Sequence, residues 1–379
     1  MWRAYLIEIM SGLVGPEVEM STNGRLDITL NQAGSATVTV QKSSLEGITA
    51  RWFRPWAQGI LLTLEVDALG GEVPVFAGPI TSPPDEYVDS LSFSVNGIRS
   101  IFEHRVLLAG DYSPTELNKI RTSVVEFKDK SLAYIAQTIV KAGIDKKGGY
   151  LPIRFATNPG TGSHQRTDYK GYDLENNRID KRLTEISNVI GGPDIMFVPE
   201  WVNSTRQYIR WAMYTGTEGY PAIAQSWTMV LDAGAPQPQI SELSMNVDGS
   251  HYATRAYATG AGEGAGIAMR VYEDERLLRD GHPALETVVS YPSVKRGSTL
   301  GDYARAATGI RPMVELHATI DISDDRSPYG QWMVGHEALV KPGPWHTIHD
   351  AETPLRILRM AGDLDSPHMT LYFQEEPAW

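Results

Sequence analysis

The chain has 379 residues, 42% of them hydrophobic and 21% charged, which predicts roughly two to four soluble domains and excludes a largely disordered chain. It has no cysteine, so disulfides, thiolate metal sites and cysteine nucleophiles are excluded, and it lacks both a signal-peptide pattern and the run of about 20 apolar residues that crosses a bilayer. A formal net charge of −12, with the acidic residues spread along the chain, argues against a basic surface that holds nucleic acid.

Residues 1–105 show the alternation of apolar and polar residues that is typical of β-strands. Leu26, Ile28 and Leu30, for example, would share one face of a strand. Glycine and proline turns separate the apolar runs, a pattern typical of a small barrel or sandwich. The predicted strands are Ala4–Met10, Arg25–Leu30, Ala36–Val40, Ile60–Val66, Val73–Ala77 and Leu91–Val95.

Residues 106–235 combine helical and strand patterns. Apolar residues recur at helical spacing between Leu132 and Val140 and predict an amphipathic helix, which Ser131 caps and Gly143 ends. Asn158–Gly171 has no apolar period and is expected to be an exposed, mobile loop. Strands are predicted at Ile153–Phe155, Tyr208–Tyr214 and Trp227–Leu231.

Within this region, Asn177–Trp201 predicts a second amphipathic helix followed by a strand. Asn177 would cap the helix, Gly191 and Gly192 would end it, and Ile195–Val198 would form the strand. The apolar stripe of the helix is formed by Ile179, Leu183, Ile186 and Ile190. The polar residues expected to face water are Arg178, Lys181, Arg182 and Glu185.

After the turn-rich stretch Ala233–Pro238 the β pattern returns. Ile240–Val247 and Tyr252–Thr259 flank Asp248-Gly249, a dipeptide that favours a hairpin turn, so we expect these two strands to pair. Thr299–Thr308 predicts a third short helix. Further strands are predicted at Val314–Ile320, Ala338–Val340, Leu355–Met360 and Met369–Phe373.

Together these patterns predict a mainly β fold with an α+β insert. Two small β-barrel-like domains, residues 1–105 and 236–379, would flank a mixed α+β region of residues 106–235. The last predicted strand ends close to Trp379.

No motif predicts a catalytic residue, a cofactor or a metal. Gly260–Ala265 fits G-x-G-x-x-G/A, but hairpin patterns surround it, and a flexible hairpin tip is the simpler interpretation. His346, His349 and Asp350 could share a metal if their segment were helical, whereas the neighbouring prolines favour a loop with surface histidines. Any two carboxylates could be considered a catalytic pair, and no spacing singles one pair out. Examples are Glu200, Asp324 and Asp325.

The least ordinary aromatic cluster is Trp52, Phe53 and Trp56, interleaved with two arginines. Three interpretations stay open. Exposed rings could stack on sugars or anchor a protein partner, buried rings would belong to the core, and in a homo-oligomer the same rings could contact a second subunit.

The order of several segments resembles the minor tail proteins of long-tailed phages that infect actinobacteria, of the kind that builds the tail hub. The resemblance covers most of the chain and rests on the shared order of segments, none of which is a catalytic motif. The segments are Arg51–Trp56, Val75–Ile80, Gly191–Asp194 with Phe197–Pro199, the stretch rich in glycine from Gly260, His282–Glu286, and the helix opened by Ser298–Leu300.

This resemblance implies a structural protein of the virion tail tip, folded in the host cytoplasm, and not an enzyme. Three copies would form a ring between the tail tube with its distal tail protein and the host-facing tip with its receptor-binding proteins. The ring would keep a channel for the tape measure protein and then for DNA in transit. Two alternatives are a glycan-binding tail protein that uses Trp52 and Trp56, and a cell-wall hydrolase that uses carboxylates or the His346/His349 pair.

Overall fold

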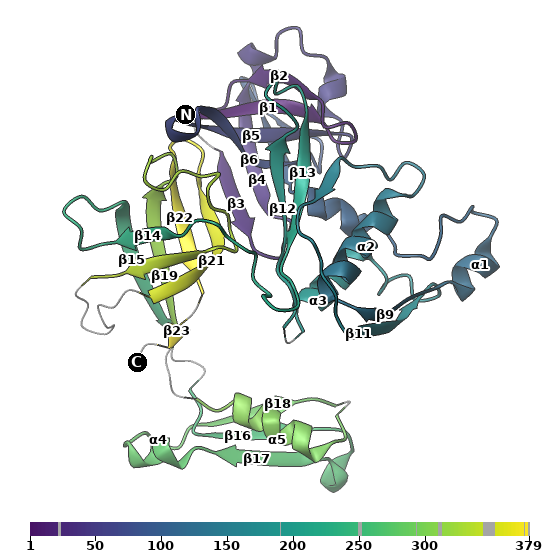
Figure 1. The fold of residues 1–379 in the computed structure, drawn as a ribbon, viewed down its shortest axis with the longest axis vertical. Helices are drawn as coiled ribbons and strands as arrows, with labels where there is room; N and C mark the ends of the chain where they lie inside the picture. The colour runs from purple at the N-terminus through teal and green to yellow at the C-terminus, as the bar shows by residue number, and fades with distance from the viewer. Residues whose placement is uncertain are drawn as a thin grey trace. The chain divides into compact units, whose positions relative to one another are not determined.

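The computed structural model describes residues 1–379 except 22–23, 190, 249–251, 293, 310–312, 344–352, 375 and 378–379. The chain forms two compact units, drawn as a ribbon in Figure 1. The first contains Met1–Leu243, Ala318–Pro342 and Glu352–Phe373, and the second contains Ser244–His317 with two short C-terminal segments. No helix in the described part of the chain is long and apolar enough to cross a membrane.

The first unit begins with a four-stranded antiparallel sheet in the order β2-β1-β5-β6. β5, one of its two inner strands, is buried on both faces for most of its length. The strands are β1 (Trp2–Glu8), β2 (Val14–Val18), β5 (Gln58–Val66) and β6 (Gly71–Pro79).

A longer sheet joins the two ends of the chain. β21 pairs antiparallel with β3, with Met360 opposite Ile28, and the path runs β15-β19-β22-β21-β3-β4-β8-β7. Its strands are β3 (Arg25–Thr29), β4 (Ser35–Gln41), β7 (Asp85–Glu86), β8 (Ser90–Asn96), β15 (Ile240–Asp248), β19 (Met313–Asp321), β21 (Thr353–Asp363) and β22 (His368–Phe373). Off this path lie β14 (Met229–Asp232), β20 (Glu337–Lys341) and β23 (Glu376–Pro377).

Two isolated bridges connect the N-terminal sheet to this longer sheet at its corners, between Ile80 and Val95 and between Met20 and Val40. The ladders of the described residues form several sheets and no closed barrel. The mainly β class with a mixed middle region is therefore confirmed, while the barrels are seen as sheets that meet at corners. The predicted domain boundaries at residues 105 and 235 both lie within the first unit, and they stay a prediction.

The insert, residues 106–235, places helices against a three-stranded sheet in the order β10-β13-β12 (Figure 1). Ser131 caps α2 as expected, because its hydroxyl accepts a hydrogen bond from the amide of Tyr134 at 3.0 Å. The elements are α1 (Leu117–Thr122), α2 (Leu132–Ile144), α3 (Ile179–Ser187), β9 (Val124–Lys130), β10 (Ile153–Phe155), β11 (His164–Lys170), β12 (Ile195–Trp201) and β13 (Ile209–Thr215).

Three expectations about the insert were wrong. The segment predicted as a loop contains β11, which pairs with β9, a strand that the sequence pattern did not predict. β12 runs through Pro199 to Trp201, because strand pairing with β13 continues past the proline. The N-cap of α3 is Arg178 rather than Asn177, whose side chain is engaged elsewhere. Ile190, the last residue of the predicted stripe, lies outside the described residues.

The second unit holds a small sheet in the order β17-β16-β18, and α5 covers one face of it. The predicted hairpin around Asp248 was wrong, because β15 neighbours β19 whereas β16 pairs with β17 and β18; Gly249 lies outside the described residues. The elements are β16 (Arg255–Thr259), β17 (Met269–Glu273), α4 (Glu275–Arg279), β18 (Glu286–Ser290) and α5 (Gly297–Ala306). The 3-10 helices of the chain are η1 (Lys42–Leu45), η2 (Ala50–Phe53), η3 (Asp67–Leu69), η4 (Ile98–His104) and η5 (Gly264–Gly266).

Candidate functional site

The aromatic cluster lies on η2 and the turn after it, and its three rings differ in burial. Trp52 is half-buried and covers Gly15 so closely that a Cβ there would lie 2.4 Å from its Cη2 atom. The half-buried Phe53 ring packs against Phe93 with 5.6 Å between ring centroids. Trp56 is 38% exposed. The cluster is thus partly core and partly surface, and its role as an interface stays a prediction.

Trp56 is held in place although it is exposed. Its φ of 65° is in the left-handed region, which is unfavourable for a bulky residue. Its amide donates to the carbonyl of Ile80 at 2.8 Å, and its ring meets His104 edge-on at 4.6 Å. Neighbouring structure therefore fixes an indole at the surface, which is the arrangement that aromatic anchor residues require.

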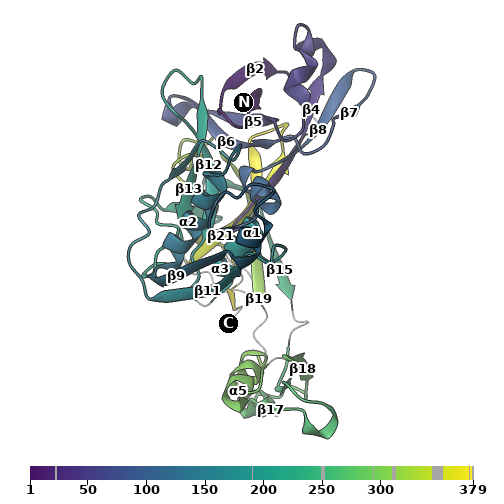
Figure 2. The same cartoon turned by 90° about the vertical axis from the view of Figure 1, so that its right-hand side faces the viewer.

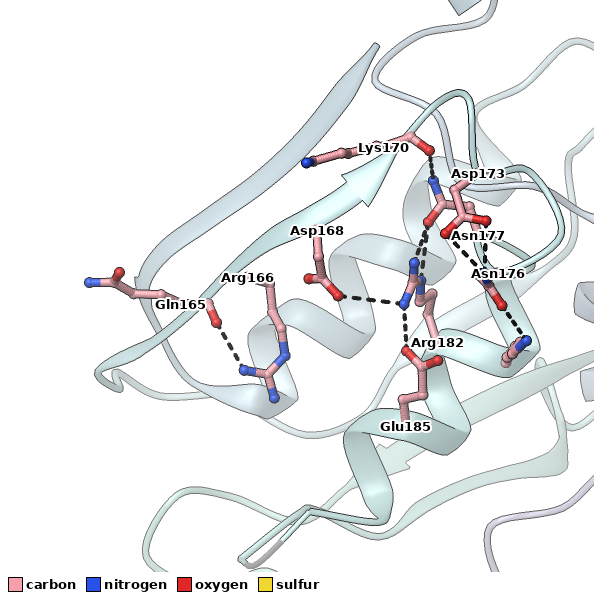
Figure 3. Close-up of polar contacts among 10 residues, drawn as sticks. Gln165, Arg166, Asp168, Lys170, Asp173, Asn176, Asn177, Arg182 and Glu185 are labelled. Carbon is pink, nitrogen blue, oxygen red and sulfur yellow. Dashed lines mark hydrogen bonds and ion pairs between the residues drawn. The ribbon is translucent and has the colours of Figure 1, made fainter. Parts of the chain in front are cut away.

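The most complete polar cluster of the insert surrounds Arg182 on α3 (Figure 3). Arg182 was expected to face water, and this was wrong: it is 5% exposed. Its Nε and Nη2 both donate to Oδ1 of Asn177, at 3.1 and 2.7 Å, and its Nη1 lies 2.7 Å from Glu185 and 3.8 Å from Asp168. The guanidinium is buried because each of its nitrogens has a partner.

The Arg182 cluster also explains how α3 is tied to the ribbon of β9 and β11. The guanidinium lies 4.5 Å from the ring centroid of Tyr169 on β11. Figure 3 shows that the side chain of Asn177 donates to the carbonyl of Lys170, at 2.7 Å. Burial raises the pKa of Tyr169 to about 12, so its phenol stays neutral at ordinary pH. This arrangement holds elements together and presents no reactive group.

A second buried arginine, Arg99 on η4, ties the N-terminal sheets to the insert. Its Nε donates to Asp180 at 2.5 Å and its Nη2 to Thr184 at 2.9 Å, both on α3, and its Nη1 donates to the carbonyl of Asn31. Asn31 lies in the turn between β3 and β4, with a φ of 61°. Its side chain accepts from the amide of Ile195 at 2.6 Å.

Asp194 extends this anchor to the C-terminal strand β21. The buried carboxylate accepts from the side-chain amide of Asn31 at 3.1 Å and is bound by Nη2 of Arg356. Burial raises the pKa of Asp194, and the guanidinium of Arg356 and the amide of Asn31 oppose that rise. Three distant parts of the sequence thus meet at one carboxylate.

Two of the carboxylates considered as catalytic candidates, Glu200 and Asp324, are paired with arginines. Glu200 lies across the sheet from Arg154 and Arg210, whose Nε atoms donate to Oε1 at 2.6 and 2.5 Å. Burial raises the pKa of Glu200, but the two arginines outweigh it and lower the pKa below its ordinary value. Asp324 is similarly paired with Arg326 at 2.6 Å. These groups are poor proton donors or nucleophiles because they are held as paired anions.

The remaining sequence candidates give no site among the described residues. Gly260–Ala265 lies in the connection of the antiparallel pair β16 and β17, as expected for a hairpin tip. His346, His349 and Asp350 lie outside the described residues. Within the described part of the chain, no group of three or more His, Asp and Glu residues is arranged to hold a metal ion.

The polar anchors at Arg99, Arg182 and Asp194 were not found from the sequence. A lone arginine on a helix face is typical of a solvated position, and its partners lie on other elements. The available signal was local: Glu185 lies three residues after Arg182 on the same helix, and Asn177 lies five residues before it, ahead of the helix.

The fold is similar to that of known tail proteins over the whole chain. The 43 kDa tail protein of prophage MuSo2 from Shewanella oneidensis matches with a TM-score of 0.54 at 12% identity, covering 100% of this chain and 99% of that chain. A tail protein from Neisseria meningitidis MC58 matches with a TM-score of 0.53 at 13% identity, covering 99% and 96%. At these identities the likeness shows the fold.

A chain of the Francisella PdpA-VgrG complex is also similar, with a TM-score of 0.53 at 7% identity, but this protein covers 57% of that longer chain. No protein-family model matches the sequence, and the comparison with curated proteins gives no match.

Proposed function

We propose that this chain is a structural subunit of a phage tail tip or baseplate hub that acts by assembly rather than by catalysis. The observation that carries the proposal is the end-to-end similarity of its fold to two tail proteins, which leaves no large part of the chain unmatched. The anchors at Arg99, Arg182 and Asp194 support it, because they make the first unit stiff without presenting a reactive group.

In this proposal three copies form a ring at the virion tail tip of a long-tailed actinobacteriophage. The ring joins the distal tail protein of the tube to the tip proteins and leaves a channel for the tape measure protein and DNA. Closed cyclic symmetry repeats one interface around the ring.

The distribution of charge supports a channel that does not retain DNA. Residues 1–105 contain 12 acidic and 7 basic residues and residues 236–379 contain 20 and 12, whereas the insert contains 14 and 15. The whole acidic excess is therefore in the two β-rich regions. If their strands line the channel, like charge repels the phosphate backbone during transit.

The test uses the full chain. Native mass spectrometry and negative-stain imaging should show a ring of three copies at micromolar concentration, and labelling of intact virions should place it at the tail tip. A monomer at every concentration would overturn the ring. Clearing of purified cell walls by the isolated chain would overturn the non-enzymatic role, and a basic channel lining in a ring reconstruction would remove the charge argument.

A further inference from the structure

The hairpin tip, Asp85–Asp89, consists of β7 and the turn that leads to β8, and it is apolar in the middle with acidic residues at its ends. Figure 2 shows this hairpin extending from the N-terminal sheets. Tyr87 is 58% and Val88 is 89% exposed. The tip has a defined shape, because the amide of Tyr87 donates to the carbonyl of Ser90 at 2.9 Å. Exposed apolar groups on an ordered hairpin are typical of a contact surface.

The charges of the hairpin tip are mostly uncompensated. Glu86 pairs with Lys42 at 2.8 Å, whereas Asp85 and Asp89 have no ion pair among the described residues. The tip therefore offers two free carboxylates on either side of Tyr87 and Val88. A surface that receives it should be apolar in the middle and basic at its edges.

The insert carries such a surface, which we call the α1 patch and define as Leu117, Arg121, Val124, Lys170 and Tyr172. Leu117 is 69% and Tyr172 is 66% exposed, and Val124 is exposed as well. Arg121 and Lys170 are exposed and have no ion pair within the described part of the chain. Lys170 lies 6.0 Å from the ring centroid of Tyr172.

The two segments of the α1 patch are adjacent in space. The amide of Gly171 donates to the carbonyl of Ser123 at 2.6 Å. Gly171 also lies so close to the end of α1 that a Cβ there would be 1.9 Å from the carbonyl oxygen of Ile120. Lys170 and Tyr172, on either side of Gly171, are thereby fixed beside Arg121 and Val124.

We propose that the hairpin tip of one copy docks on the α1 patch of the next copy; this inference rests on the proposed ring. Asp85 and Asp89 would meet Arg121 and Lys170, and Val88 would be covered by the apolar members of the patch. Contact between two tips would oppose carboxylates, and contact between two patches would oppose cations. Charge thus favours a head-to-tail contact of unlike surfaces, which is what a cyclic ring of three requires.

The first test uses the absence of cysteine from the chain. Val88→Cys and Leu117→Cys are made in separate chains, mixed and oxidised. The mixture should give a covalent dimer that reductant reverses, and a chain with both substitutions should give covalent trimers. A matched control mixes Val88→Cys with Val230→Cys, a residue that is 50% exposed and lies outside both surfaces, and should give none.

The second test reverses charges at exposed positions, and circular dichroism checks that each variant is folded. Asp85→Lys with Asp89→Lys, or Arg121→Glu with Lys170→Glu, should each weaken ring formation by tenfold or more, and the four substitutions together should restore it. A wild-type ring without the expected cross-link, or with no response to either reversal, would overturn this contact and leave the proposed function standing. A wild-type monomer would overturn both.

Discussion

Two three-stranded sheets of this protein share a ladder pattern but differ in what covers them. In the insert, β13 pairs parallel with β10 and antiparallel with β12; in the second unit, β16 pairs parallel with β18 and antiparallel with β17. The insert sheet contributes Trp211 and Met213 to a large buried cluster with α2, α3 and the N-terminal sheet. The fully buried cluster of the second unit is Ala256, Ala258, Leu300 and Ala304.

The difference comes from a second layer. Trp211 donates from Nε1 to the carbonyl of Ala77 at 3.0 Å, so the insert sheet is joined to β6 as well as to its helices. Within the second unit, Val271 and Val288 lie opposite Tyr257 in one row and are 50% and 67% exposed. Stabilisation by burial grows with the apolar area removed from water. The two sheets therefore differ in stability although their strands pair in the same pattern.

Trp211→Ala should have the largest effect on the difference in stability between the two sheets. The substitution removes the largest fully buried side chain among the described residues and its hydrogen bond, so we expect the free energy of unfolding of the first unit to fall by about 3–5 kcal/mol. Urea unfolding measures it. Hydrogen exchange in β16 and α5 should be unaltered, and equal loss of protection there would show that the two cores are not separate.

Leu300→Ala is the corresponding change in the second unit. It should cost about 2–3 kcal/mol locally, because Leu300 is the only large side chain in its fully buried cluster among the described residues. Amide exchange should become faster in β16–β18 and α5 and stay unchanged in α2 and α3. Ala304→Gly serves as a milder control, and loss of protection throughout the insert would contradict the prediction.

Acid should lower the stability of the first unit, because this unit contains a buried histidine. His336 is 5% exposed, and neither ring nitrogen has a hydrogen-bond partner among the described residues. Burial lowers the pKa of His336 to about 4, so below its ordinary 6.5 the unfolded chain binds the proton more readily and stability falls as pH drops. The loss is at most about 1.4 kcal/mol per pH unit.

Urea unfolding of the first unit at pH 7 and pH 5 measures this dependence. His336→Leu should reduce the slope of unfolding free energy against pH, whatever other groups contribute to it. Identical slopes in the two proteins would show that the imidazole is not responsible.

The smallest effect is expected on the open face of the second sheet. Arg255 pairs there with Glu273 and with Glu286 at 3.1 Å, but the pairs are exposed to solvent and screened. Glu286→Gln should leave the urea midpoint of the second unit unchanged. The matched change on the insert sheet, Glu200→Gln, should lower the midpoint of the first unit, since Arg154 and Arg210 both depend on that more buried carboxylate.

Local patterns predicted the helices better than the strand partners. α2 has its predicted cap, and α5 forms where a short helix was predicted, because a helix depends on neighbours within four residues. The predicted partner of β15 was wrong, because a turn dipeptide at Asp248 carries no information about β19. That strand begins 65 residues after Asp248. β11 was missed because its alternation is mostly polar, with Tyr169 as its one fully buried side chain.

The candidate site was predictable in part. The sequence drew attention to Trp52, Phe53 and Trp56, and their uneven burial follows from contacts with Gly15, Phe93 and His104 that no local pattern contains. The Arg99 anchor could not be predicted, because its partners Asn31, Asp180 and Thr184 lie on distant elements. The burial of Arg182 was missed although its partners Asn177 and Glu185 are close in the chain.

The pairing of β3 with β21 has a consequence for synthesis. Asp27 and Arg359, which bond across these strands, are 332 residues apart, so β3 gains its second neighbour only after the several hundred residues between them have been translated. Until β21 has been synthesised, the hairpin of β3 and β4 has an unpaired edge at β3. A chain that ends before β21 keeps this edge of β3 open, and an open strand edge is a template for pairing with another chain.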